Sequence, residues 1–257
     1  MAIAGVTFKD KTKKQPSREG VTGKEGSGKS SVARHLKGNK LICDLELKLP
    51  LEVLQDPTCQ VVEFNGEPTF DKVLDMLKSL YKADKLPIQW LVIDTVSMLE
   101  KIIHKNVLAR DFDNNKEKFS AYATGYKASY HDCDRFLDLL TRIEDKHKIN
   151  TCLIIHAATK NVKNVFGDDY PKLELSLTEG MANSVLRFLH YNGVIYDKIS
   201  VKKEGLAKKA TGLERYISFD NKSAYFNAKS MRQDMPKEVP FDIDGKWMDL
   251  TINKEIK

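Results

Sequence analysis

Short apolar runs alternate with amphipathic stretches along the first two thirds of the chain. The runs KLICDLE (40–46), QVVEF (60–64), QWLVIDT (89–95) and TCLIIHA (151–157) are rich in valine, isoleucine and leucine. Runs that are apolar on both faces are typical of strands in a parallel sheet that is covered on both sides. The pattern therefore predicts a buried strand at each of these four positions.

Two of the intervening stretches, 69–82 and 131–148, have the periodicity of helices, with apolar residues three and four positions apart. The periodic positions are Phe70, Val73, Leu74 and Leu77 in the first stretch and Phe136, Leu139, Leu140 and Ile143 in the second. Thr69 is the expected N-cap of the first helix. Strands that alternate with helices predict an α/β fold with crossover connections.

The last third of the chain has a different pattern. GVIYDKISVKK (193–203) predicts a strand, and ERYISFDNKSAYFNAK (214–229) predicts two strands joined by a turn at Asp-Asn-Lys-Ser. We expect these strands to extend the sheet in antiparallel fashion.

Three further segments bear on domain organisation. Residues 1–19 are polar and basic and predict an N-terminal arm, so that residues 20–257 form a single domain. Residues 106–129 and 158–181 are poorly patterned and predict long loops, which are usually functional or mobile in a compact domain.

The stretch TGKEGSGKSS (22–31) matches the pattern G-x-x-x-x-G-K-[ST] of a P-loop. Glycines allow successive backbone N–H groups to surround phosphate oxygens, and a following helix, SSVARHLKG (30–38), would direct its positive end at them. Lys29 would reach the β- and γ-phosphates, and the Ser30 hydroxyl would ligate Mg²⁺. The predicted ligands are therefore ATP and Mg²⁺. The predicted nucleotide-binding residues are Gly23, Lys24, Glu25, Gly26, Ser27, Gly28, Lys29, Ser30 and Ser31.

Carboxylates end two of the predicted strands. Asp94 follows WLVI, at the end of a strand where α/β sheets bind ligands, and is the expected partner of Ser30 at the metal. Asp94 is followed by Thr95, so the base that activates water is expected elsewhere. Asp44 and Glu46 end the strand LICDLE and share one face if the strand extends that far, and either one is a candidate.

Composition narrows the class of protein. The 257 residues include 42 basic and 36 acidic residues, a net charge of +6 that permits a nucleic-acid partner without requiring one. The four cysteines form no CxxC pair, which argues against a zinc site or a disulfide framework. No stretch approaches the ~18 apolar residues of a membrane helix, and we expect a soluble cytoplasmic protein without a membrane partner.

The order of the segments GKEGSGKSS, LICDLE, WLVIDTVSMLE, LIIHAATK and YFNAKSMRQDMP resembles that in RecA-like ATPases. The resemblance covers about residues 18 to 240 and is strongest to compact phage ATP-binding proteins of the single-strand annealing and recombinase type. It implies a RecA-like P-loop core, with a mostly parallel sheet flanked by helices and antiparallel C-terminal strands. It also implies Mg²⁺-dependent ATP hydrolysis that is stimulated by DNA.

The resemblance assigns further roles. It implies that Glu46 is the hydrolytic base, that His156 senses the γ-phosphate, and that Lys229 or Arg232 reaches into the ATP site of a neighbouring subunit. Together with Lys29 of the P-loop and Asp94 at the end of its strand, these residues form the expected catalytic set: Lys29, Glu46, Asp94, His156, Lys229 and Arg232.

The segments 106–129 and 158–181 match the two loops that face single-stranded DNA in that architecture. Their basic and aromatic residues would hold phosphates and stack on bases. The expected DNA-binding residues are Arg110, Lys127, Lys160, Lys163 and Phe166. The implied partners are single-stranded DNA, further copies of the chain in a ring or filament, and a single-strand DNA-binding protein.

Two alternatives use the same P-loop. One is a small-molecule or nucleoside kinase, although LAKKATGLER (206–215) offers one arginine where such kinases carry an arginine-rich lid. The other is a DNA-binding module that ATP gates without being hydrolysed.

Overall fold

A mixed sheet forms the centre of the computed structural model, which describes residues 15–164, 167–204, 207–242 and 244–252. Its ten strands follow the order β10-β8-β7-β1-β5-β4-β2-β3, with β6 beside β5 and β9 beside β7. Strands β7, β1, β5, β4, β2 and β3 are parallel to one another, and the remaining pairings are antiparallel. The predicted α/β class with antiparallel C-terminal strands is confirmed.

The strands are β1 (Arg18–Gly23), β2 (Lys40–Asp44), β3 (Cys59–Val61), β4 (Trp90–Asp94), β5 (Asn150–Val162), β6 (Tyr170–Leu175), β7 (Tyr191–Glu204), β8 (Ala207–Ser218), β9 (Lys229–Ser230) and β10 (Glu238–Pro240). The helices are α1 (Val32–His35), α2 (Leu51–Leu54), α3 (Phe70–Lys82), α4 (Val96–Phe112), α5 (Lys116–Ser120), the 3₁₀ turn η1 (Ala121–Ala123), α6 (Thr124–His147), α7 (Glu179–Phe188) and α8 (Lys246–Leu250). Among the described residues, no helix combines the length and hydrophobicity needed to cross a bilayer.

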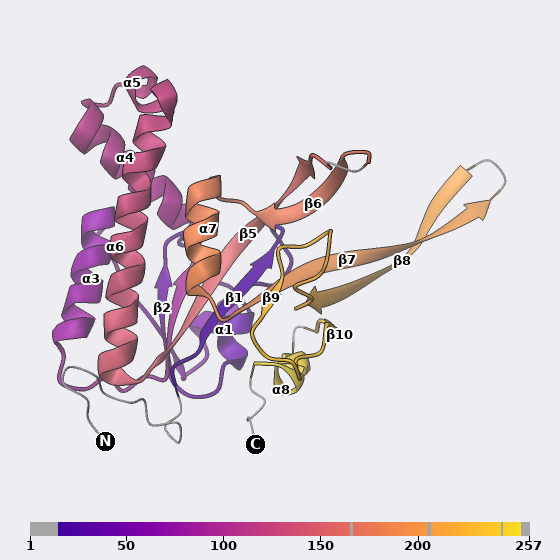
Figure 1. Ribbon diagram of the computed structural model, residues 1–257. Helices are drawn as coiled ribbons and strands as arrows, with labels where there is room; N and C mark the ends of the chain where they lie inside the picture. Colours follow the sequence, from indigo (N-terminus) through magenta and orange to yellow (C-terminus); the bar gives the residue numbers. More distant parts are fainter. Residues whose placement is uncertain (1–14, 165–166, 205–206, 243, 253–257) are drawn as a thin grey trace, which may run out of the picture.

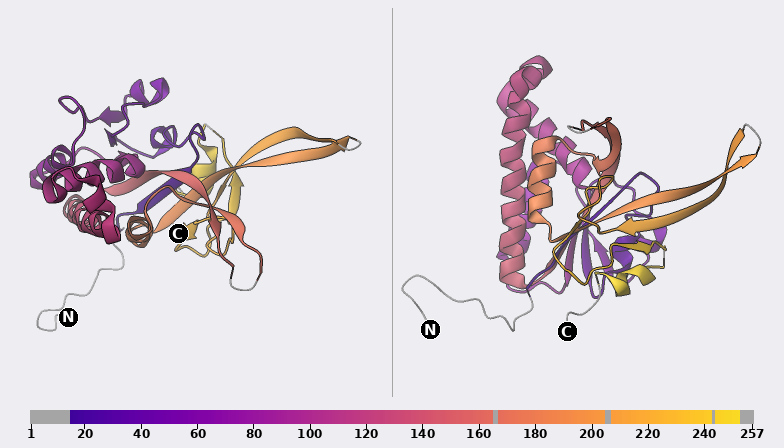
Figure 2. Two further views of the ribbon diagram at one scale, coloured as in Figure 1. Left: turned by 90° about the horizontal axis from the view of Figure 1, so that it is seen from above. Right: turned by 45° about the vertical axis from the view of Figure 1, so that its right-hand side comes forward.

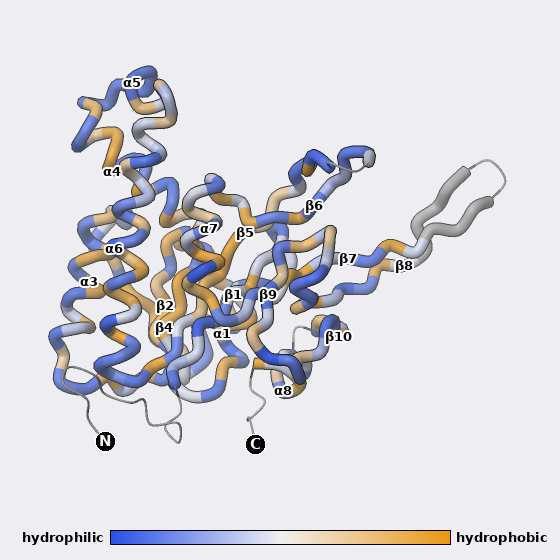
Figure 3. The backbone as a smooth tube through the Cα atoms, viewed as in Figure 1, coloured by the Kyte–Doolittle hydropathy of each residue, from blue (hydrophilic) through white to orange (hydrophobic). Residues whose placement is uncertain are grey.

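Strand β4 shows why the central runs are apolar throughout. Its residues Leu91 and Ile93 belong to a core shared with α3, α4, α6 and α7, whereas Trp90 and Val92 belong to a second core shared with α1, α2 and α8. Side chains alternate along a strand, so a sheet that is covered on both faces needs apolar residues at every position. The long helices lie together on one face (Figure 1), and hydrophobic positions concentrate between them and the sheet (Figure 3).

The two helices with clear periodicity form where the sequence predicts them. Thr69 caps α3 by accepting the backbone N–H of Lys72 at 3.4 Å. The second predicted stretch lies within α6, which begins seven residues earlier than its periodic part, at Thr124.

The expectation of a long loop at 106–129 is wrong, because this segment is helical. Helix α4 continues to Phe112, and α5 and η1 lead into α6, which forms a projection with α5 at its tip (Figure 1). Rings of His104, Phe112, Phe119 and Tyr126 pack edge to face inside it. These rings come from three helices, so their spacing in the sequence has no single helical period.

The segment 158–181 is also mostly ordered structure. Strand β5 extends to Val162 and pairs with β6, from Ala157 opposite Leu175 to Val162 opposite Tyr170. Helix α7 then begins at Glu179. The expected loop is therefore a hairpin followed by a helix.

Strand pairing in the last third differs from the predicted hairpin. The turn exists, since the N–H of Ser223 donates to the carbonyl of Asp220 at 3.1 Å, but the residues after it do not pair with β8. Strand β8 pairs with β7 instead, over eleven residue pairs from Val194–Ser218 to Glu204–Ala207, and β10 covers the other edge of its last residues.

Strand β1 begins at Arg18, so residues 18 and 19 of the expected arm belong to the sheet. It lies between β5 and β7, and all but its first residue are buried. Glu19 is 2 % exposed within this strand, and burial raises the pKa of its carboxyl to about 8. With polar residues at Arg18, Glu19 and Thr22, β1 lacks the continuous apolar run that predicts the other central strands.

Gly125→Ala tests the helical projection. Alanine normally stabilises a helix interior relative to glycine, but a Cβ here would lie 2.2 Å from the ring of Phe119. We expect a loss of about 1–3 kcal/mol of unfolding free energy in urea titrations, as for other overpacked sites. Lys127→Ala, on the exposed face of the same helix, is the control and should leave stability unchanged. A gain of stability in Gly125→Ala would contradict the packing.

Candidate functional site

The register of the parallel strands brings the predicted chemical groups to one edge of the sheet. Gly23 of β1 lies opposite His156 of β5, and Asp94 of β4 lies opposite Ile154 of β5 and Asp44 of β2. The carboxyl ends of neighbouring parallel strands thus meet at one level, where such sheets bind ligands.

Three glycines of the predicted P-loop each meet a steric requirement. Gly26 and Gly28 have φ angles of 73° and 87°, which disfavour residues with a Cβ. A Cβ on Gly23 would lie 2.5 Å from the Ser27 hydroxyl oxygen. The loop therefore depends on glycine to fold back beside the end of β1.

Two polar side chains in this loop, those of Ser27 and Lys29, are buried. The Ser27 hydroxyl is buried and has no hydrogen-bond partner among the described residues. Lys29 is 5 % exposed, and its ammonium donates to the carbonyl of Lys24 within the loop at 2.7 Å. Burial lowers the pKa of Lys29, against the opposing effect of Asp94, Glu46 and Glu25. A buried cation and an unpaired donor suit the phosphates of a nucleotide.

The helix after the loop is shorter than predicted. Helix α1 has four residues, and it is preceded by turns in which the N–H groups of Val32, Ala33 and Arg34 donate to carbonyls three residues back, at 3.1–3.2 Å. The helix dipole expected at the phosphates is correspondingly reduced.

Ser30 and Asp94 meet at the predicted metal position, where the Ser30 hydroxyl is hydrogen-bonded to the Asp94 carboxylate. Asp94 is 3 % exposed. Burial raises the pKa of Asp94 from 3.8 to about 6, helped by the charges of Asp44 and Glu46 and opposed by Ser30 and Lys29. One hydroxyl and one carboxylate suit Mg²⁺, which takes few protein ligands and completes its shell with phosphate oxygens and water.

Glu46 lies beside this pair in a polar cluster. Its Oε1 accepts from the Thr95 hydroxyl at 2.7 Å and lies 2.8 Å from Nε2 of His156. Burial alone would raise the pKa of Glu46, but the hydrogen bonds from Thr95 and His156 and the charge of Lys29 hold it below the ordinary value. The carboxylate is thus kept ionised and oriented, as a general base requires.

Asp44, the alternative base, has a different environment. Its carboxylate accepts the backbone N–H groups of Glu46, Leu47 and Leu49 at 3.1, 2.8 and 3.3 Å. Leu47 has a φ of 56°, so this cap holds a tight turn after β2. Asp44 shapes the turn that positions Glu46.

The last two expected catalytic residues do not lie at the P-loop of their own chain. Lys229 pairs with Asn192 at the amino end of β7, the end of the sheet opposite the P-loop, and its ammonium donates to the carbonyls of Leu186 (2.6 Å) and Leu189. The guanidinium of Arg232 binds both carboxylate oxygens of Asp234, at 3.0 and 2.7 Å. A role across a subunit interface stays a prediction for both.

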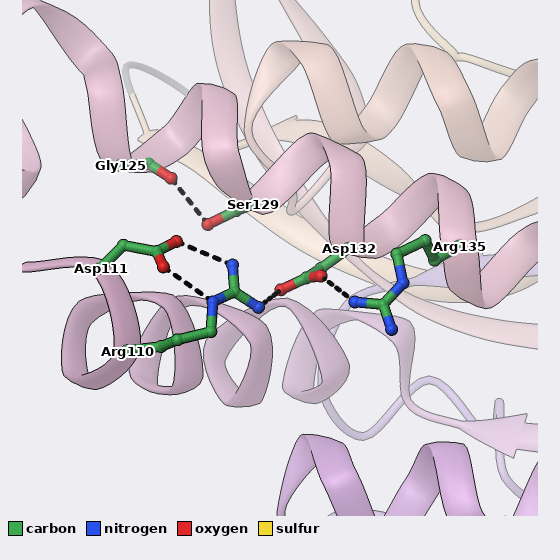
Figure 4. Close-up of polar contacts among 6 residues, drawn as sticks. All are labelled: Arg110, Asp111, Gly125, Ser129, Asp132 and Arg135. Atoms are coloured by element: carbon green, nitrogen blue, oxygen red, sulfur yellow. Dashed lines mark hydrogen bonds and ion pairs between the residues drawn. The ribbon is translucent and has the colours of Figure 1, made fainter.

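The expected DNA-binding residues lie on separate elements. Arg110, on α4, is held by Asp111 at 2.8 and 2.7 Å and by Asp132 of α6 at 2.9 Å (Figure 4), and these carboxylates raise its pKa. Asp132 also accepts from Arg135 at 2.9 Å. Much of the positive charge of Arg110 is therefore balanced within its own chain.

The other expected DNA contacts differ in their surroundings. Lys127 is exposed on α6. Lys160 and Lys163 are exposed on or just after β5, and Lys160 donates to the carbonyl of Leu177 at 3.2 Å. Phe166 lies outside the described residues.

The family model described as an AAA domain, AAA_24, matches residues 16–230. This chain belongs to the AAA domain family. Its P-loop and the carboxylates beside it thus belong to a nucleotide-dependent ATPase fold, and ATP is the nucleotide that this family indicates. No curated protein matches the chain significantly.

Two residues that the sequence did not indicate also contact the P-loop of this AAA domain. The guanidinium of Arg215, on β8, lies 3.4 Å from the carbonyl of Gly26 and binds Asp197 at 2.8 Å. The ring of Phe241, beyond the matched segment, packs so close to Gly28 that a Cβ there would lie 3.2 Å away. In the sequence, Arg215 is distinguished only as an isolated arginine in a lysine-rich strand, and Phe241 is not distinguished at all.

Asp94→Asn tests the cost of the buried carboxyl. The folded protein binds the Asp94 proton more tightly than the unfolded chain does, so stability falls as pH rises from about 4 to about 6. Asparagine removes this cost, and we expect a nucleotide-free gain of about 1–3 kcal/mol at pH 8 that vanishes near pH 4. Mg²⁺-dependent nucleotide binding should weaken in the same variant.

Urea titrations at both pH values measure this gain. Asp75→Asn, at an exposed residue paired with Lys78, is the matched control and should be neutral at both. If Asp94→Asn were no more stable than wild type at pH 8, this result would contradict the raised pKa of the buried Asp94 carboxyl.

Glu46→Gln and Asp44→Asn separate the two carboxylates. Glu46→Gln keeps the shape but loses the base, so steady-state ATP turnover should fall by about 100-fold or more while nucleotide affinity is retained. Asp44→Asn weakens a cap of three N–H groups and should cost about 1–2 kcal/mol of stability. Phosphate release, nucleotide titration and thermal melting measure these effects. Normal turnover in Glu46→Gln together with lost turnover in a fully stable Asp44→Asn would reverse the roles.

Proposed function

We propose that this AAA domain is a Mg²⁺-dependent ATPase that acts on single-stranded DNA in recombination or annealing, of the type that phages encode. The observation that carries the hydrolytic part is the cluster of Glu46, Thr95 and His156 beside Lys29 and Asp94. An ionised carboxylate, fixed by two donors at the edge of a phosphate cradle, suits the activation of a water molecule.

The remaining groups act on the nucleotide. Lys29 and the N–H groups of the P-loop hold the phosphates and offset the charge that spreads over the γ-phosphoryl oxygens. Ser30 and Asp94 would hold Mg²⁺, which neutralises phosphate charge when bound. His156 contacts Glu46 and lies beside the P-loop strand, where it can respond to the γ-phosphate.

Hydrolysis explains this site better than transfer to an acceptor molecule. The segment 206–215, considered as the lid of a kinase, belongs mostly to β8, and its arginine, Arg215, contacts the P-loop from the side of the sheet. Glu46 keeps 20 % of its side chain exposed, which gives water access to it.

The DNA and assembly parts of the proposal have separate support. The net charge of +6 permits a polyanionic partner. Lys127, Lys160 and Lys163 are exposed cations that could follow a DNA backbone. The proposal also includes assembly into a ring or filament, in which Arg232 would approach the ATP site of a neighbour, and action beside a single-strand DNA-binding protein.

Phosphate release with and without single-stranded DNA tests the proposal. We expect Mg²⁺-dependent hydrolysis that single-stranded DNA accelerates severalfold, and near-complete loss of turnover in folded Lys29→Ala, because the charge on the phosphates is no longer balanced. ATP binding without any phosphate release would indicate a nucleotide-gated binding module. Transfer of phosphate to an added nucleoside, without free phosphate, would indicate a kinase.

A further inference from the structure

A cavity of about 800 Å³ lies between α6, α7, β6 and the segment 221–229 that follows β8. Its volume is within the range of ligand sites, about 300–1,000 Å³. Figures 1 and 2 show α7 beside α6 on one face of the sheet. The lining includes four residues of α7 that are three and four positions apart, Gly180, Asn183, Ser184 and Arg187. Much of this helix face therefore borders open space.

The side chains that line this cavity carry mostly positive charge. They include Lys172 of β6, Arg187 of α7 and Lys229 of β9, and among the described lining residues Asp134 of α6 is the one acid. Lys172 is balanced in part by Glu174 at 3.5 Å. Arg187 is exposed, and no carboxylate of the described residues pairs with it. The cavity thus has an excess of positive charge, which suits an anionic ligand.

Lys229 is a half-buried cation at one end of the cavity. Its ammonium donates to the main-chain carbonyls of Leu186, at 2.6 Å, and Leu189 at the C-terminal end of α7. Burial lowers its pKa, and no carboxylate of the described residues pairs with it. An ammonium has three donors, so one remains for a ligand. An anion in the cavity would offset part of the cost of burying this charge.

Aromatic rings and amides lie among these cations. The rings of Tyr130 and Phe226 line the cavity, and the exposed amides of Asn183 and Asn221 lie at its border. Cations bind phosphates, aromatic rings stack on bases, and asparagine amides can hydrogen-bond to base edges. The lining therefore suits a ligand that has both phosphates and bases.

The cavity adjoins a second one of about 340 Å³, because Lys172 and Phe226 line both. Lys24 and Ser27 of the P-loop line the second cavity, together with Tyr225, whose side chain is 61 % exposed. We call the two cavities together the β6 groove. A groove that continues from α7 to the P-loop favours an extended ligand over a compact one. A single strand of nucleic acid is extended, and its unpaired bases can stack on side chains.

We infer that the β6 groove binds a single strand of nucleic acid, with phosphates at Lys172 and Arg187 and a base stacked on Tyr225. This inference rests on the proposed function and places the strand on a surface other than the lysines expected from the sequence. Because the groove continues to the P-loop, a strand bound in it changes the rate of ATP turnover.

Two variants of the full chain test the groove. Lys172→Gln combined with Arg187→Gln removes two charges, and Tyr225→Ala removes the exposed ring. Fluorescence anisotropy measures the affinity of each variant for a labelled oligothymidine over a range of salt concentrations. Phosphate release with and without the strand measures ATP turnover, and thermal melting checks that the variants are folded.

Each variant has a matched control outside the groove. Lys101→Gln combined with Arg142→Gln removes two exposed charges from α4 and α6. Tyr122→Ala removes a ring that is 94 % exposed in the helical projection. Both controls should bind the strand like wild type.

The two groove variants should differ in their salt dependence. We expect the double charge variant to bind at least about fivefold more weakly, with a salt slope reduced by about 1.4, since each lost phosphate contact removes about 0.7. Tyr225→Ala should also bind about fivefold or more weakly, but with an unchanged slope, because stacking releases no counterions. Basal ATP turnover should stay within about twofold of wild type in both, and stimulation by the strand should be lost.

Three results would overturn the inference. If the double charge variant keeps the wild-type slope, or Tyr225→Ala the wild-type affinity, the strand does not lie in this groove, although the proposed function stands. If wild type hydrolyses ATP but binds no strand, the DNA part of the proposed function fails together with the groove. If thymidine monophosphate or polyglutamate displaces the strand at an equal concentration of charges, the occupant is a free nucleotide or an acidic protein segment instead.

Discussion

A carboxylate buried at the end of β4 sets the conditions for everything around the P-loop. Asp94 is 3 % exposed, and the nearby carboxylates of Asp44 and Glu46 oppose its ionisation. Lys29 and the Ser30 hydroxyl offset this cost only in part, because its pKa stays raised to about 6. The edge of the sheet therefore has an electrostatic demand for a further cation, which the proposed Mg²⁺ would meet.

The strands around Asp94 position the other polar groups of the site. Strands β2 and β5 flank β4, so the turn after β2 and the end of β5 place Glu46 and His156 on either side of it. The Asp44 carboxylate accepts hydrogen bonds from three backbone N–H groups, which fixes the turn that carries Glu46. Two carboxylates two residues apart thus have different surroundings: Asp44 holds the backbone, and Glu46 contacts the side chains of Thr95 and His156.

The last third of the chain also contacts the P-loop. Strand β7 lies beside β1, so Arg215 of its partner strand β8 contacts the P-loop, and the C-terminal segment brings Phe241 against Gly28. Phe241 lies beyond the segment that the AAA domain model matches. The P-loop therefore receives contacts from within the matched segment, through Arg215, and from beyond it, through Phe241.

The sequence by itself determined the P-loop, the buried strands β2, β4 and β5, helix α3 and the candidate carboxylates, because each depends on local spacing: glycines at fixed intervals, apolar runs and a 3.6-residue period. The expectation of a buried strand in the run 60–64 is wrong, because β3 lies at the edge of the sheet and its residues are half-buried or exposed. It did not determine the helical projection at 106–129, because the rings of His104, Phe112, Phe119 and Tyr126 meet from three helices and share no local period.

Only the tertiary structure shows that Asp44 and Glu46 have different surroundings, since the partners of Glu46, Thr95 and His156, lie far away in the chain. The same holds for the pairing of β8 with β7 rather than with the residues after its own turn. Strand patterns indicate that a residue will lie in a sheet, but hydrogen-bonded partners are chosen by the whole chain. Contacts such as Arg215 with Gly26 therefore leave no local signal in the sequence.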